Sequence, residues 1–205
     1  MILKTIYATL LALLCSACAS SGLSQWAGSN NFGVVVNSRL MQGFSIKNGV
    51  EGKSDDGRHL FGFAELNERG GQTSGYGGIG LPKWVDVSWR TGEFIQRYDP
   101  LNKSVWTGGT ITGRYRLEVA SRIPQETLQY ASAKKGRAVK LMFRILNDDV
   151  VLGWCVQEIG IADDWFETNY KGDFMPAKWF NGKLITIGWY IDKKTGQRVE
   201  TTTGR

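Results

Sequence analysis

Short runs of β-branched and aromatic residues, separated by frequent glycines, constrain the fold of this chain more than any other feature. Of its 205 residues, 26 are glycine and only 4 are proline. The clearest run is Trp84–Arg90, in which Val85, Val87 and Trp89 alternate with the intervening residues. Alternation with a period of two places one set of side chains on one face of a strand. The sequence therefore predicts a mainly β domain, built as an antiparallel sheet or sandwich.

Further runs of the same composition predict the other strands. The expected strands are Phe32–Val36, Phe44–Lys47, Leu60–Leu66, Glu93–Tyr98, Tyr115–Ala120, Val139–Leu146, Val150–Gln157, Leu184–Ile191 and Gln197–Thr201. Two hairpins are expected, because Asn147–Asp149 and Asp192–Gly196 have the composition of turns. Residues 66–80 are rich in glycine and are expected to form a long loop.

One segment departs from the β pattern. Residues 121–136 have Pro124 near the start, lysines near the end and a final glycine. These are typical start and stop signals, so one helix of about three turns is expected to pack on the sheet. Leu128 and Ala131 lie on one side of this helix and should face the sheet, with Ile123 packing beside its first turn.

The N-terminus has the layout of a bacterial secretory signal peptide. Lys4 precedes a short apolar core, and small residues follow that core. The core is shorter than the roughly 20 apolar residues that a membrane-spanning helix needs. Cys18 follows two small residues and fits the acylated cysteine of a lipoprotein signal, whereas Cys15 follows two bulky leucines. The alternative is an ordinary cleaved signal that happens to contain two cysteines.

The domain organisation follows from this signal. Residues 1–17 are expected to be a lipoprotein signal peptide, residues 18–29 a flexible tether and residues 30–205 a single β-rich globular domain. Each methylene group of the acyl chains on Cys18 contributes about 0.8 kcal/mol of binding free energy when it is buried in the membrane, so stable anchoring is expected. By resemblance to bacterial lipoprotein signals, Ala19 in place of an aspartate implies the outer membrane, facing the periplasm. Cys155 is then expected to be a small core residue outside any disulfide.

Charge and motifs argue against several classes of function. The formal net charge of +6 is spread along the chain without a basic block, so no nucleic-acid partner is expected. The glycine run Gly75–Gly80 lacks the lysine and hydroxyl residue of a phosphate-binding loop. His59 is the sole histidine and has no nucleophile motif beside it, and a zinc site would need mainly carboxylates. No catalytic, cofactor-binding or metal-binding residue is therefore assigned.

The segment 163–182 is aromatic but lacks a clear period, and it is expected to be an irregular loop. Such a loop either packs over the core or presents anchors to a partner. Tryptophan and tyrosine dominate the energetics of protein interfaces, so Trp165, Tyr170 and Trp179 are candidate partner-binding residues.

A second class of function is left open by the same segment. Asp163 and Asp164 are adjacent carboxylates within an aromatic environment. Glycosidases use a pair of carboxylates, so the alternative is a cell-envelope hydrolase that acts on peptidoglycan or glycans. Adjacent aspartates are also common in turns, which is the structural interpretation.

The segment Leu81–Arg90, with its Leu-Pro and Val-x-Trp-Arg pattern after a glycine-rich loop, resembles an uncharacterised family of Gram-negative lipoproteins known only as a domain of unknown function. Arg122–Thr127 followed by Leu141–Trp154 resembles the helix-then-hairpin half of that family. Asn48–Val50, with the later Gly-Gly loop, is similar to a second such lipoprotein family. The resemblance covers about residues 30–160.

Members of both groups often accompany type VI secretion genes. The resemblance therefore implies an immunity or accessory lipoprotein, whose protein partner would be a toxin or a secretion component. It carries over no catalytic residue, because none is assigned in either family. The sequence as a whole predicts a lipid-anchored lipoprotein that acts by binding another protein.

Overall fold

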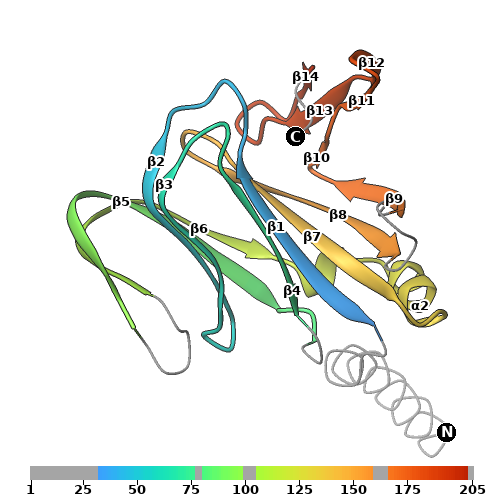
Figure 1. The fold of residues 1–205 in the computed structure, drawn as a ribbon, viewed down its shortest axis with the longest axis horizontal. Coiled ribbons are helices and arrows are strands. Elements are labelled where there is room, and N and C mark those ends of the chain that lie inside the picture. Colours follow the sequence, from blue (N-terminus) through green and yellow to red (C-terminus); the bar gives the residue numbers. More distant parts are fainter. Residues whose placement is uncertain (1–31, 77–79, 99–104, 159–165, 203–205) are drawn as a thin grey trace, which may run out of the picture.

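The computed structural model describes residues 32–76, 80–98, 105–158 and 166–202 of the chain (Figure 1). The expected signal peptide, Cys18 and most of the expected tether therefore lie outside the described residues. The strands are β1 Gly33–Leu40, β2 Lys47–Ser54, β3 His59–Leu66, β4 Gly71–Tyr76, β5 Trp84–Arg97, β6 Val105–Glu118, β7 Arg137–Ile145, β8 Val150–Glu158, β9 Phe166–Gly172, β10 Phe174–Met175, β11 Lys178–Phe180, β12 Lys183–Thr186, β13 Gly188–Ile191 and β14 Arg198–Thr201. The helical elements are a single 3-10 turn, η1, at Ala120–Arg122 and the α-helix α2 at Gln125–Ser132.

Two sheets pack face to face to form a β-sandwich. Sheet A has the strand order β4-β1-β7-β8-β9 and sheet B the order β3-β2-β5-β6. One hydrophobic core joins them, and the rings of Phe61 in β3 and Phe143 in β7 lie 5.5 Å apart across it. Figure 1 shows the two layers, with α2 beside the ends of β7 and β8. The prediction of a mainly β fold with one helix packed on it is confirmed.

Sheet A contains one exception to antiparallel pairing. Among the described strands, β1 and β7 pair in parallel, with Gly33 opposite Ala138 and Leu40 opposite Ile145. The remaining described pairs are antiparallel. A parallel pair needs a long crossover connection, and here it contains all of sheet B.

The centre of sheet A is apolar on both faces. In β8, Val150 and Leu152 point into the sandwich, while Val151 and Cys155 point to the other side. A second hydrophobic cluster covers that side, and Phe174 in β10 belongs to it. Strands covered on both faces have nearly continuous apolar sequences, which explains the run in β8. Cys155 is buried there, as the sequence predicts.

The helix is shorter than expected. It covers eight residues, and β7 begins at Arg137, close behind it. Part of the segment 121–136 therefore forms the link into the sheet and not a third helical turn. Leu128 and Ala131 are buried in the core of the sandwich, and Ile123 is buried with them, as predicted.

Three local expectations were wrong. The glycine-rich segment 66–80 contains strand β4, which pairs with β1, and residues 44–46 precede β2 and are not part of a strand. The segment 163–182 contains β9, β10 and β11. Strand β4 is formed by pairing with β1, about 35 residues earlier, and such long-range pairing is not encoded in local composition. Both expected hairpins are present, as β7–β8 and β13–β14.

Candidate protein-binding surface

The outer face of sheet B carries a buried charge. Glu51 in β2 is buried, and its Oε1 accepts a hydrogen bond from Nη2 of Arg90 in β5 at 2.9 Å. Its Oε2 lies 3.3 Å from Nζ of Lys53, which also points to this face. Two cations therefore neutralise one carboxylate. A buried carboxylate is tolerated only when it is paired in this way.

Arg90 connects this carboxylate to the far half of the β5–β6 hairpin. Its Nη1 donates a hydrogen bond to the carbonyl oxygen of Gly108 in β6 at 3.0 Å. The hairpin bends at this point, because the β5–β6 pairing changes register between Trp89 and Arg90 and again between Thr91 and Phe94. Gly109 has a φ of 63°, and a methyl group there would lie 2.7 Å from the carbonyl oxygen of Thr91. Only glycine fits this bend.

The part of the hairpin beyond the bend is called the arm, residues 91–98 and 105–111. Figure 1 shows the hairpin curving sharply at the left of the view. Trp106 in the arm packs edge-to-face against Phe94, with ring centroids 5.5 Å apart. A methyl group on Gly62 in β3 would lie 3.3 Å from the indole nitrogen of Trp106 and 2.7 Å from Cε1 of His59. The arm therefore folds back over β3, and the missing side chain of Gly62 leaves room for both rings.

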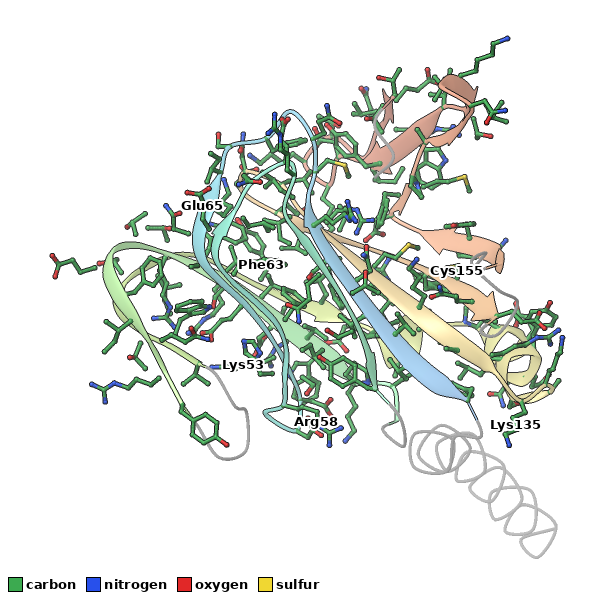
Figure 2. The ribbon with its side chains drawn as sticks, viewed as in Figure 1. Lys53, Arg58, Phe63, Glu65, Lys135 and Cys155 are labelled. Carbon is green, nitrogen blue, oxygen red and sulfur yellow. The ribbon has the colours of Figure 1, made fainter. Side chains whose placement is uncertain are left out.

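His59 lies at the base of this contact. Burial lowers the pKa of its imidazole, the nearby Glu51 raises that pKa, and Lys53 lowers it again. The net direction is down, so the neutral imidazole is favoured at neutral pH. Figure 2 shows Lys53 towards the β2–β3 turn, near Arg58, and Glu65 at the opposite end of β3.

The arm exposes large apolar side chains. The exposed fractions are 56% for Ile95, 77% for Tyr98 and 37% for Ile111. All three belong to a hairpin whose bend is fixed by the Glu51–Arg90–Gly108 connection. These apolar groups are therefore displayed on a positioned element.

The two edges of sheet B differ. At β3, the phenol of Tyr76 donates a hydrogen bond to the carbonyl oxygen of Leu60 at 2.6 Å, and the amide of Gly62 donates one to Oε1 of Gln72 at 3.3 Å. Both Tyr76 and Gln72 come from β4 of the other sheet. Two outward backbone groups at this edge, the carbonyl of Leu60 and the amide of Gly62, are thus occupied by side chains. We call it the sealed edge.

In the described part of the chain, β6 pairs with β5 alone, and its other side is the open edge of sheet B. The amide of Val119 donates to the carbonyl oxygen of Lys83 at 2.9 Å, in register with the β5–β6 pairs from Trp84–Glu118 to Trp89–Gly113. Hydrogen-bonded and non-hydrogen-bonded pairs alternate in an antiparallel ladder. The backbone groups of Arg114, Arg116 and Glu118 therefore point away from β5, along the open edge.

The side chains along the open edge are mostly charged. Arg116 donates to both carboxylate oxygens of Asp86 in β5, each at 2.8 Å, and its guanidinium lies 4.9 Å from the centre of the Trp84 ring. The hydrogen bond from Arg116 lowers the pKa of Asp86, and the charges of Arg116 and Arg114 act in the same direction. Arg114 is exposed and forms no ion pair with any residue that the structure describes.

Of the partner-binding candidates from the sequence, Tyr170 alone has a described side chain. It is partly buried in β9 and packs against the second hydrophobic cluster. Trp179 lies in β11, with its backbone opposite Leu184. Trp165 lies outside the described residues. The structure does not bring these three residues together into one described surface, and their role stays a prediction.

Adjacent aspartates occur in the sequence at 55–56, 148–149 and 163–164, and the structure describes the first two pairs. Asp163 and Asp164, on which the hydrolase alternative depends, lie outside the described residues. Oδ1 of Asp55 accepts the amide of Lys83 at 2.9 Å, which ties the β2–β3 turn to the start of β5. Asp148 and Asp149 in the β7–β8 turn form ion pairs with Lys194 and Lys193. These contacts match the turn interpretation of the aspartates at these two sites.

Within the described ranges, no cluster of three or more histidine, cysteine, aspartate or glutamate side chains is arranged to hold a metal ion. None of the described helices has the length and apolar character required to cross a bilayer.

Sequence reasoning did not single out the residues that build the arm and the open edge. Glu51 lies in a segment that predicts no strand, and Arg90 is part of the Val-x-Trp-Arg pattern but has no partner in the local sequence. The one available signal was that the expected strands Trp84–Arg90 and Glu93–Tyr98 are separated by two residues, and both lie in the single long strand β5 apart from Tyr98.

Comparison with protein-family models, with curated proteins and with solved structures found no match to this chain. The resemblance to uncharacterised lipoproteins therefore stays a prediction from the sequence.

Proposed function

We propose that this chain is a lipid-anchored lipoprotein of the periplasm that acts by binding another protein through the arm and the open edge of sheet B. The observation that supports the binding role is the exposure of Ile95, Tyr98 and Ile111 on one positioned hairpin. The support for the anchor is Cys18 after a short apolar signal. A role as an immunity or accessory protein against a secreted toxin is what the lipoprotein resemblance implies.

Single exposed apolar residues are common on protein surfaces and need no special explanation. The arm differs because its apolar residues share one hairpin, next to a sheet edge whose outward backbone groups pair with no described strand. Larger exposed apolar areas mark interaction sites. The bend is also held in place by Arg90, so binding would not have to order a mobile hairpin.

Site-specific photo-crosslinking in the native envelope tests the binding role. A photoreactive amino acid at Ile95 is expected to give a discrete adduct of defined mass. The same substitution at Ile185, an isoleucine in β12 with an exposed fraction of 62%, serves as the matched control. The adduct protein, once identified and purified, should bind the wild-type chain in solution and bind Ile95→Glu at least about tenfold more weakly, a loss of about 1.4 kcal/mol. Equal adducts from both positions, or none from Ile95, would contradict the proposal.

The anchor is tested separately. Cys18→Ala is expected to move the protein from the membrane fraction to the soluble periplasmic fraction, while Cys15→Ala should leave it on the membrane. Mass spectrometry of the mature wild-type protein should show an acylated cysteine at its amino terminus. An unmodified amino terminus on the wild-type protein would rule the anchor out.

A further inference from the structure

We infer that the partner contributes an extended segment that adds to sheet B as a new strand alongside β6, with a carboxylate opposite Arg114. This inference rests on the proposed function and names the way in which the partner binds. Extended segments add to exposed sheet edges through main-chain hydrogen bonds, and alternate side chains give specificity.

The backbone of β6 has the groups that such a strand requires. The amides and carbonyls of Arg114, Arg116 and Glu118 point away from β5 and are not used by another described strand. These three residues occupy every second position of β6, and the bend at Arg90 ends this regular stretch. The segment that fits therefore spans about six residues, or roughly 20 Å at the usual rise of a strand.

The contrast with β3 shows that the open edge is not a general property of this sheet. At β3, Tyr76 and Gln72 already hold the outward carbonyl of Leu60 and the outward amide of Gly62. An added strand would have to displace both side chains. At β6 the neighbouring side chains are arginines on the outer face, which leave the backbone accessible while discouraging pairing with another basic edge.

The side chains of β6 define the chemistry of the segment. Arg114 is exposed and has no ion-pair partner among the described residues, whereas Arg116 is already held by both oxygens of Asp86. A carboxylate directly opposite Arg114 would gain a cross-strand pair, and a lysine there would be repelled. On the other face, the ring of Tyr115 is half-buried and stacks on Trp89 at 5.1 Å, so an apolar side chain suits that position.

A designed peptide tests this inference on the mature protein. The probe is the acetylated and amidated peptide Thr-Val-Glu-Val-Glu-Val-Thr, which places its carboxylates on one face and its valines on the other. Binding is followed by the amide chemical shifts of the protein and by titration calorimetry. We expect saturable shifts at Arg114, Arg116 and Glu118, and none at Leu60 or Gly62.

Three controls separate charge from backbone pairing. Arg114→Glu and the milder Arg114→Gln should weaken peptide binding by about tenfold and about threefold, while Lys135→Glu, an equal change of charge beside α2 (Figure 2), should leave it unchanged. A peptide with lysine in place of glutamate should not bind. The glutamate peptide with alternate backbone nitrogens methylated should also not bind, because it cannot pair with β6.

The outcomes are distinct from those of the crosslinking experiment. Binding that needs both Arg114 and the peptide amides supports strand addition. An Ile95 adduct together with no peptide binding, or with binding that survives methylation, overturns strand addition but leaves the proposed function standing. Concentration-dependent dimerisation of the wild-type protein that Arg114→Glu weakens and that the peptide competes with would show that a second copy of this chain occupies the edge, and it would also overturn the inference.

Discussion

Both edges of sheet B carry backbone groups that no neighbouring strand of the sheet pairs, and the two edges differ in what occupies those groups. At β3, two side chains from the other sheet occupy the outward carbonyl of Leu60 and the outward amide of Gly62. At β6, no described strand pairs with the outward groups of Arg114, Arg116 and Glu118. The difference has a topological cause. β3 continues through a short turn at Asn67–Gly70 directly into β4 of sheet A, so β4 lies against it. β6 continues into η1 and α2, and no described strand follows beside it.

This contrast shows that edge protection in this sandwich depends on connectivity more than on strand composition. Both β3 and β6 contain aromatic and glycine residues, and they are the opposite edge strands of the four-stranded sheet B. Among the described contacts, β3, whose successor crosses to the opposite sheet, receives side chains from that sheet on its outward backbone groups, and β6 does not. The open edge carries charged side chains, which is one of the ways in which natural proteins limit unwanted pairing at an edge.

The largest expected effect comes from breaking the ion pair that lies between the two edges. Glu51→Ala leaves the largely buried guanidinium of Arg90 without its carboxylate, so we expect a loss of about 3 kcal/mol or more in the free energy of unfolding. Chemical denaturation measures this loss. The double variant Glu51→Leu with Arg90→Met should recover most of it, since no buried charge remains. A single-variant loss below about 1 kcal/mol would show that the pair does not hold the sheet.

A pair of proline substitutions tests the pairing register of the open edge. Tyr115→Pro removes an amide that the register directs towards β5, whereas Arg114→Pro removes one that points outward. Proline is tolerated at an edge when the missing N–H faces solvent. We therefore expect Tyr115→Pro to destabilise the protein by about 1–3 kcal/mol more than Arg114→Pro, as measured by urea unfolding. Equal losses, or the reverse order, would invalidate the assigned register.

A smaller effect is expected at the sealed edge. Tyr76→Phe keeps the ring but removes the hydroxyl that donates to the carbonyl oxygen of Leu60, so about 1 kcal/mol of stability should be lost. Amide exchange at residues 60–62 should become faster, while exchange at Arg114 and Arg116 should not change. If Tyr76→Phe leaves the exchange of β3 unaffected, the phenol does not seal this edge.

The smallest expected effect is a dependence on pH beneath the arm. The pKa of His59 is lowered in the folded protein by burial, so the unfolded state binds the proton more tightly. The stability contributed by neutral His59 is therefore fully present above the ordinary imidazole pKa of about 6.5 and is lost as the pH falls through the folded-state value. Melting temperatures between pH 8 and pH 5 should fall more for the wild type than for His59→Gln. Parallel curves for the two proteins would contradict this assignment.

The groups around His59 bear on the same measurement. The charges of Glu51 and Lys53 in β2 act on the pKa of His59, and the ring of Trp106 in the arm lies near the same glycine, Gly62. Substituting Lys53→Met should reduce the downward shift of the His59 pKa, because one neighbouring positive charge is removed. Titration of the His59 ring by NMR reads this change directly.

Much of the fold was predictable because its main strands carry their own periodicity. Val85, Val87 and Trp89 alternate with polar residues, and the β7–β8 hairpin has an acidic turn between two apolar runs. The helix was predictable from Pro124 and from its apolar side, although its end was not. The helix ends at Ser132, and residues 133–136 form the turn that leads into β7 at Arg137.

β4 and the open edge were not predictable from local sequence. The sequence of β4 is Gly-Gln-Thr-Ser-Gly-Tyr, which has little strand propensity. It forms a strand because all six of its residues pair with β1. Glu51 and Arg90 are 39 positions apart, and their pairing depends on the register of β2 against β5. The open edge is set by which element follows each edge strand, β4 after β3 and η1 after β6, and this connectivity cannot be deduced from the sequence of the edge strand itself.

The parallel neighbours β1 and β7 impose an order on how this chain matures. Asn37 bonds to Arg144, a residue 107 positions later, so the middle of sheet A cannot be completed until most of the polypeptide has emerged. Sheet B, with its hairpins, has no such delay and can assemble first. Contacts that distant slow the search for the native state. Until β7 has been made, the side of β1 that pairs with β7 is an exposed strand edge, although β4 can already cover the other side.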